Sequence, residues 1–67
     1  MFAVFIRSSE TEDWKYMLTS TTKGLAELHS EYYMKIKLCN IAKVFQFKHA
    51  KDIPSKLEAT YATKIFN

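Results

Sequence analysis

The sequence has very little glycine, proline or cysteine, and each shortage excludes a class of structure. Gly24 and Pro54 are the single residues of their kinds among 67, which argues against a glycine-rich phosphate-binding loop and against a flexible linker between two domains. Cys39 is the single cysteine, so it has no partner for a disulfide within the chain and cannot supply a cysteine-rich metal cluster. We therefore expect one domain over residues 1–67, with no bound metal or cofactor.

Long apolar runs are missing as well. No run approaches the roughly 18 apolar residues that a membrane-spanning helix requires. The first residues lack the basic segment and the cleavage site of a signal peptide. These observations predict a cytoplasmic protein with no membrane partner.

Charge is distributed unevenly along the chain. The net charge is +3, but residues 1–33 carry −2 and residues 34–67 carry +5. A basic half attracts polyanions or an acidic protein, although no dense cluster of basic residues is present and solvated surface lysines would look the same. The candidate nucleic-acid contacts are Lys35, Lys43, Lys48, Lys51 and Lys56.

The beginning of the chain gives the strongest strand signal. Residues 2–6 are five consecutive apolar residues that end at Arg7, and a run of this length and composition is typical of a strand buried on both faces. The polar residues 8–13 predict a hairpin loop, and residues 14–19 alternate as a half-buried strand does. Residues 42–48 predict a third strand.

Two helices are expected. Residues 20–22 offer N-cap side chains, and the helix that follows carries apolar residues at helical spacing, namely Leu25, Leu28, Tyr32, Ile36 and Cys39. We expect it to end near Asn40, but residues 34–38 also alternate like a strand, so an end near Tyr33 is the alternative. A second helix is predicted from Asp52, with Pro54 in its first turn and an apolar stripe of Leu57, Tyr61 and Ile65.

Together these elements predict a small α+β domain of order β-β-α-β-α, with a three-stranded antiparallel or mixed sheet and both helices on one face. The covered face would carry Phe2, Val4, Ile6, Trp14, Tyr16, Leu18, Phe45 and Phe47. The bare face would expose an apolar patch with a basic rim, which is typical of an interaction surface. Its residues are Phe5, Met17 and Val44 in the patch and Arg7, Lys15 and Lys48 around it. Self-association would hide the same patch.

Residues for catalysis are few. Nucleophilic catalysis needs a nucleophile, a base and a group that orients the base, and Cys39 with His29 or His49 is the one cysteine–histidine combination. Cys39 belongs to the apolar side of its helix, which predicts a buried, unreactive thiol. The carboxylates within residues 10–13 lack the spacing of a calcium loop. We therefore predict that the protein is not an enzyme.

The order of elements resembles the core of GIY-YIG nuclease domains, with residues 3–5 on the first strand and residues 16–18 on the second. Residues 57–66 are similar to the last helix of that family, where a glutamate binds the catalytic metal, and Glu58 stands at that position. The likeness spans most of the chain. A half ferredoxin-like sheet with two helices has the same order of elements.

The chain departs from this family at the residues that carry its chemistry. Ala3 and Leu18 stand where the family has glycine, and its arginine on the first helix falls near Leu25 or Ala26, neither of which can stabilise a phosphate. The resemblance therefore implies a relative that has lost nuclease activity and is kept for binding.

The function predicted from the sequence is non-catalytic binding that modulates or inhibits a larger protein, by masking a surface or by adding a strand to it. Small, motif-poor proteins of this kind are common among phage and mobile-element inhibitors. If the bare face is the binding site, Phe5→Asp or Met17→Asp should abolish binding without changing the circular dichroism. The alternative is nucleic-acid binding through the lysines of the basic half, with an affinity that falls steeply as salt rises.

Overall fold

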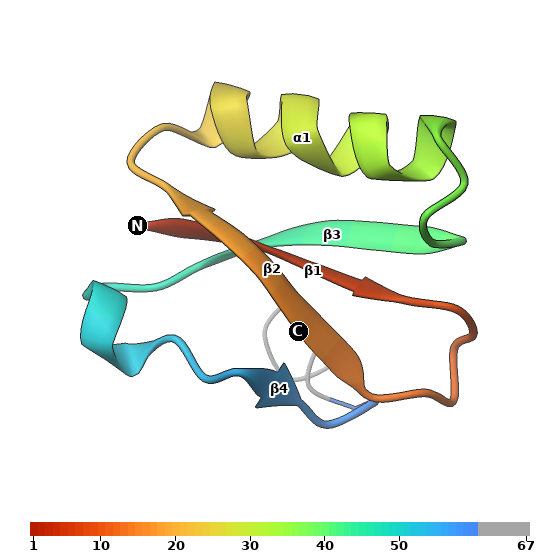
Figure 1. Cartoon of the computed structure of the whole chain (residues 1–67). Coiled ribbons are helices and arrows are strands. Elements are labelled where there is room, and N and C mark those ends of the chain that lie inside the picture. Colours follow the sequence, from red (N-terminus) through yellow and green to blue (C-terminus); the bar gives the residue numbers. More distant parts are fainter. Residues whose placement is uncertain (61–67) are drawn as a thin grey trace.

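A four-stranded antiparallel sheet with a helix across one face makes up residues 1–60, the part of the chain described by the computed structural model (Figure 1). The elements follow in the order β1 (Phe2–Arg7), β2 (Trp14–Ser20), α1 (Lys23–Lys35), β3 (Ile41–Gln46), the 3-10 turn η1 (Ala50–Asp52) and β4 (Lys56–Leu57). The strand order in the sheet is β3-β1-β2-β4. The chain is therefore a small α+β domain, as predicted, with one strand more and, within residues 1–60, one α-helix fewer.

Strand β1 is the centre of the sheet and is buried on both faces, which confirms the interpretation of the apolar run. Ala3, Val4 and Phe5 have no exposed surface. β1 pairs with β2 as a hairpin and with β3 on its other side, and Val4 lies opposite Leu18 and Val44 in the two ladders. The register with β2 shifts between Val4 and Phe5, and such an irregularity increases the local twist of the pair.

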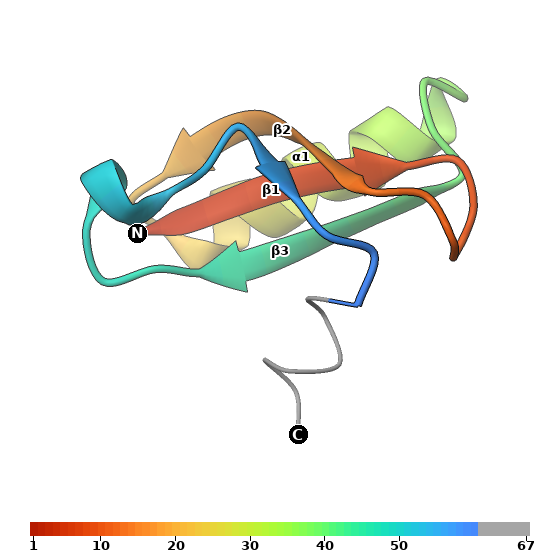
Figure 2. The same cartoon turned by 90° about the horizontal axis from the view of Figure 1, so that it is seen from below.

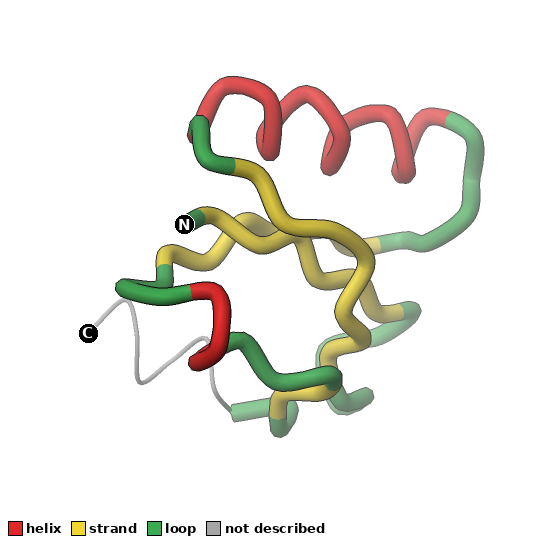
Figure 3. Tube along the Cα trace, turned by 60° about the vertical axis from the view of Figure 1, so that its left-hand side comes forward, coloured by secondary structure: helices red, strands yellow, loops and turns green. Residues whose placement is uncertain are grey.

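The face of the sheet turned away from α1 carries an aromatic cluster. Its buried members are Ala3, Phe5, Trp14, Phe45, Phe47 and Leu57. The ring of Phe5 meets those of Tyr16 and Phe45 edge to face, with centroids 5.8 and 5.5 Å apart, an arrangement that aromatic pairs prefer. The segment from η1 to β4 crosses this face (Figure 2), and the backbone of this segment curls back beneath the strands (Figure 3).

The predicted second helix is wrong for residues 53–60. Ile53 has an extended backbone, with ψ 114°, because a residue before proline is disfavoured in the helical region. Leu57 then pairs with Trp14 in β4 and is buried in the aromatic cluster. The remaining apolar positions predicted for that helix, Tyr61 and Ile65, lie outside the described residues.

Two side chains next to the hairpin loop hold the segment that follows β4. The guanidinium of Arg7 donates from Nη1 to the carbonyl oxygens of Glu10 and Ala59, at 3.0 and 3.1 Å. Asp13 accepts from the backbone N–H of Ala59 at 3.2 Å and forms an ion pair with Lys56 at 3.3 Å. The two contacts with Ala59 join residues that are 52 and 46 positions apart.

Helix α1 begins at an N-cap that the sequence predicted, and it ends earlier than predicted. The hydroxyl of Thr22 accepts from the backbone N–H of Leu25 at 3.4 Å. The last helical residue is Lys35 rather than one near Asn40. After it Lys37 adopts the left-handed conformation, at φ 61°, so that the N–H of Leu38 reaches the carbonyl of Tyr33 at 3.0 Å. This is the Schellman arrangement that closes many helices.

Replacing Lys37 by glycine is expected to stabilise the fold by about 1 kcal/mol, because a side chain at a left-handed position is strained and glycine is not. For a domain of this size that gain raises Tm by roughly 4–8 °C. Thermal unfolding followed by circular dichroism measures the change. Lys35→Gly is the matched control and should lower Tm, since glycine within a helix is unfavourable. A lower Tm for Lys37→Gly would contradict the assignment.

Candidate functional site

The residues predicted to form an apolar patch on a bare sheet face do not form one exposed surface. Phe5 was expected at its centre, but it has 0% exposed surface and is the middle of the aromatic cluster. The reason is the path of the chain after β3, which covers this face with η1 and β4 instead of returning a helix to the α1 side (Figure 2). Val44 lies opposite Val4 and is half-buried. Met17 is also half-buried.

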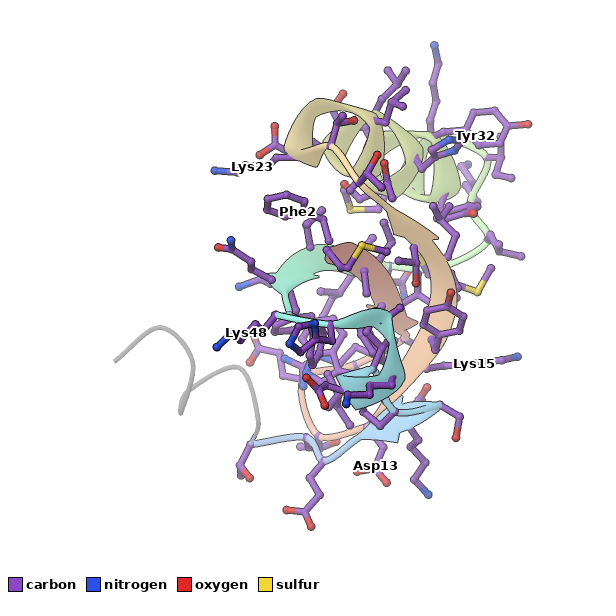
Figure 4. The ribbon with its side chains drawn as sticks, turned by 90° about the vertical axis from the view of Figure 1, so that its left-hand side faces the viewer. Phe2, Asp13, Lys15, Lys23, Tyr32 and Lys48 are labelled. Atoms are coloured by element: carbon purple, nitrogen blue, oxygen red, sulfur yellow. The ribbon has the colours of Figure 1, made fainter. Side chains whose placement is uncertain are left out.

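The predicted basic rim is not one surface either. Arg7 points inward, with its guanidinium carbon 3.9 Å from the centroid of the Trp14 ring. Lys15 and Lys48 are exposed but project from opposite sides of the molecule (Figure 4). A role for Lys15, Lys48 or Met17 in binding stays a prediction.

The lysines predicted for nucleic-acid binding are spread over several elements. Lys35 closes α1, Lys43 lies in β3, and Lys48 and Lys51 lie before and within η1. Lys56 lies in β4 and forms an ion pair with Asp13. All five are exposed, and their binding role also stays a prediction.

Among residues 1–60, the exposed large apolar side chains lie on α1 and directly after it. Leu25, Leu28, Tyr32 and Ile36 are 52%, 60%, 54% and 50% exposed, and we call these four residues the α1 stripe. Met34 and Leu38 are exposed beside it. The sequence predicted these residues as an apolar stripe, and their helical spacing would normally place them against the sheet. Instead the stripe faces solvent.

The buried side of α1 consists of small residues. Ala26 and Ser30 are the buried positions of the helix, and the Ser30 hydroxyl donates to the carbonyl of Glu27 at 2.8 Å. Small side chains let the helix lie close to the sheet, whose bulky residues Val4 and Ile6 fill the layer between them. The signal in the sequence that could have revealed this is the four-residue spacing of Ala26 and Ser30, which marks a second, narrower face.

The α1 stripe is hollowed near its middle. Leu28, His29 and Tyr32 line a shallow depression of about 380 Å³ whose walls are almost entirely apolar. Tyr32 projects outward from the helix (Figure 4), and its ring lies 6.2 Å from that of Tyr33. This surface can accept an apolar side chain but offers few hydrogen-bonding groups to a polar ligand.

Charged residues follow a definite order along α1. Glu27 and Glu31 lie in the middle of the helix, and Lys35 and Lys37 lie at its end. Lys23, in the first turn, is 3.8 Å from Glu27. Along α1 the charged side chains are therefore basic in the first turn, acidic in the middle and basic at the end.

A second depression of about 570 Å³ lies between β2 and the η1 segment. Its lining residues are Met1, Tyr16, Thr19, Ala50, Ile53, Pro54 and Ser55. Several polar groups around it bond to each other: the hydroxyls of Tyr16 and Thr19 are 2.7 Å apart, and the amino group of Met1 donates to the carbonyl of Phe47 at 2.9 Å. It is a less apolar surface than the α1 stripe.

Cys39 is buried, as the sequence predicted. Loss of hydration raises the pKa of its thiol, and the backbone N–H of Ile41 opposes that rise in part. Within residues 1–60 no group of three or more His, Cys, Asp and Glu side chains is placed to hold a metal ion. Glu58, the residue singled out by the nuclease resemblance, is exposed.

The raised pKa predicts slow modification of Cys39 by a thiol reagent. The thiolate is the reactive form, so the rate should rise with pH along a curve displaced to higher pH than that of the denatured chain. By linkage, this group stabilises the fold fully below its unfolded pKa, and the contribution is lost as pH rises through the folded pKa. Reaction with a chromogenic disulfide in buffer and in denaturant measures both curves. Coincident curves would contradict burial of the thiol.

Comparison of the chain with protein-family models, with curated proteins and with solved structures found no match. In residues 1–60, α1 falls short of the length and apolar character needed to cross a bilayer.

Proposed function

We propose that this chain is a non-catalytic binding protein that modulates or inhibits a larger protein, and that it does so through the α1 stripe. The observation that carries the proposal is the exposure of four large apolar side chains in one line on a helix whose opposite side is already packed. Contiguous exposed apolar surface of this kind is uncommon on a soluble monomer and marks interaction sites.

The chemistry of the stripe favours a protein partner. Leucine and isoleucine side chains have no hydrogen-bonding atoms, and the positions Leu25, Leu28 and Tyr32 follow the i, i+3, i+7 spacing with which helices anchor in apolar grooves. Each side chain is about half exposed, so its burial in a groove contributes on the order of 1 kcal/mol. The partner expected is therefore a protein with an apolar groove as long as α1.

The test compares the proteins captured from a cell lysate by the wild-type chain and by Leu28→Asp. Leu28 is 60% exposed, so the substitution leaves the fold intact while placing a charge at the centre of the stripe. Thr11→Asp is the matched control, because it adds the same charge to an exposed residue of the hairpin loop, and this loop lies away from α1 (Figure 1).

We expect the wild type and Thr11→Asp to capture the same proteins and Leu28→Asp to lose them. Capture that Leu28→Asp retains would contradict the proposal. A second capture is made after nuclease treatment of the lysate. Proteins that disappear only after this treatment would instead support nucleic-acid binding by the lysines of the basic half.

A further inference from the structure

We infer that the α1 stripe also binds a second copy of this chain, with the two helices antiparallel and the two Tyr32 side chains meeting at the two-fold axis. The inference starts from the symmetry of three of the four stripe residues about Tyr32. Leu28 lies four residues before it and Ile36 four residues after it, and all three are about half exposed.

A contact between identical copies related by a two-fold axis must be self-complementary. With the axis at Tyr32, Leu28 of one copy lies opposite Ile36 of the other, and the reverse pair forms on the far side of the axis. The three apolar positions are thereby all covered. The depression lined by Leu28, His29 and Tyr32 provides space for a side chain of the opposing helix near the axis.

The charges on α1 favour the antiparallel direction. Glu27 and Glu31 precede or flank Tyr32, while Lys35 and Lys37 follow it. With the axis at Tyr32, an antiparallel pair brings Glu31 of one helix within about one turn of Lys35 of the other, whereas a parallel pair brings like charges together. Glu27 already forms an ion pair with Lys23 of its own helix, at 3.8 Å. The dipoles of two antiparallel helices add a further favourable term.

The length of α1 limits the strength of the contact between the two copies. Its 13 residues extend about 20 Å, so the interface falls in the class of small, transient protein–protein interfaces. We expect a dissociation constant in the range of about 10–500 µM. The second copy and the larger protein of the proposed function would use the same stripe, so each would exclude the other, but the self-contact does not depend on that partner.

The first test is sedimentation equilibrium of the purified full chain from about 10 µM to about 1 mM, a span that covers the expected dissociation constant. The average mass of the wild type and of Thr11→Asp should rise from 7.9 kDa toward twice that value. Leu28→Asp should associate at least about tenfold more weakly, so its average mass should stay below that of the wild type at each concentration. A wild type that stays monomeric at the highest concentration would overturn the inference, and the lysate experiment would be unaffected.

The second test fixes the direction of the helices by disulfide trapping. Tyr32→Cys and Leu25→Cys are each combined with Cys39→Ala, and circular dichroism verifies that both variants fold. In the antiparallel pair the two positions 32 adjoin the axis, while the two positions 25 lie about 20 Å apart, too far for a disulfide. Mild oxidation should link Tyr32→Cys and leave Leu25→Cys unlinked. Equal linking of both variants would overturn the antiparallel arrangement.

Discussion

Replacing Phe5 by alanine is expected to leave the chain largely unfolded at 25 °C. Phe5 has no exposed surface, and its ring centroid lies 5.8, 5.5 and 6.2 Å from those of Tyr16, Phe45 and Phe47. Removing such a ring costs about 3–5 kcal/mol, from lost burial and from the cavity left behind. A domain of this size has a total stability of the same order.

Urea unfolding followed by circular dichroism measures this effect. Leu28→Ala is the matched control: it also truncates a large apolar residue, but one that is 60% exposed, and surface changes of that kind shift stability by about 0.5 kcal/mol or less. Phe5→Asp should be at least as damaging as Phe5→Ala, so the sequence-based expectation that it would spare the fold is wrong. Native-like unfolding of Phe5→Ala would contradict the position of Phe5 in the core.

The second large effect is expected at Arg7. Its guanidinium donates to three backbone carbonyls, two in the hairpin loop and one at Ala59, and it stacks on the Trp14 ring at 3.9 Å. Hydrogen bonds from a charged donor contribute about 1.5–3 kcal/mol, and the half-exposed position of the side chain places the effect near the lower end. Arg7→Ala should therefore cost about 2 kcal/mol and detach the segment after β4.

Trp14 reports this change directly, because it is the single tryptophan and has no exposed surface. We expect Arg7→Ala to shift its fluorescence to longer wavelength and to speed hydrogen exchange at the amides of Leu57 and Ala59. Arg7→Lys keeps the charge without the planar guanidinium and should give an intermediate result. Unchanged emission in Arg7→Ala would show that β4 is held without the Arg7 contacts.

The parts of the fold that local patterns predicted are those whose neighbours are close in sequence. The apolar run of β1, the alternation of β2 and the N-cap at Thr22 each follow from residues within a few positions of one another. The prediction of a second helix was wrong because Leu57 pairs with Trp14, which lies 43 positions earlier in the chain. A contact at that separation leaves no periodic signal near Leu57.

The residues of the α1 stripe were predicted as one apolar face of the helix, but the binding site was predicted elsewhere, on the sheet. Helical spacing identified Leu25, Leu28, Tyr32 and Ile36 as one face of α1, yet spacing alone does not state which face meets the sheet. Ala26 and Ser30 decide that question, because they allow the closer approach. The bare-face residues were misassigned for a related reason, since the path of η1 and β4 determines which side of β1 is covered.

The central position of β1 also has a consequence during synthesis of the protein. β1 leaves the ribosome before β2 and β3, which flank it, and before Leu57, which completes its cover. At typical elongation rates Leu57 follows Ile6 after about 3–10 s. For that interval an unpaired, β-prone apolar segment is accessible to chaperones and to the same segment of neighbouring nascent chains. Yield on a polysome should therefore depend on translation speed between the codons for β1 and β4.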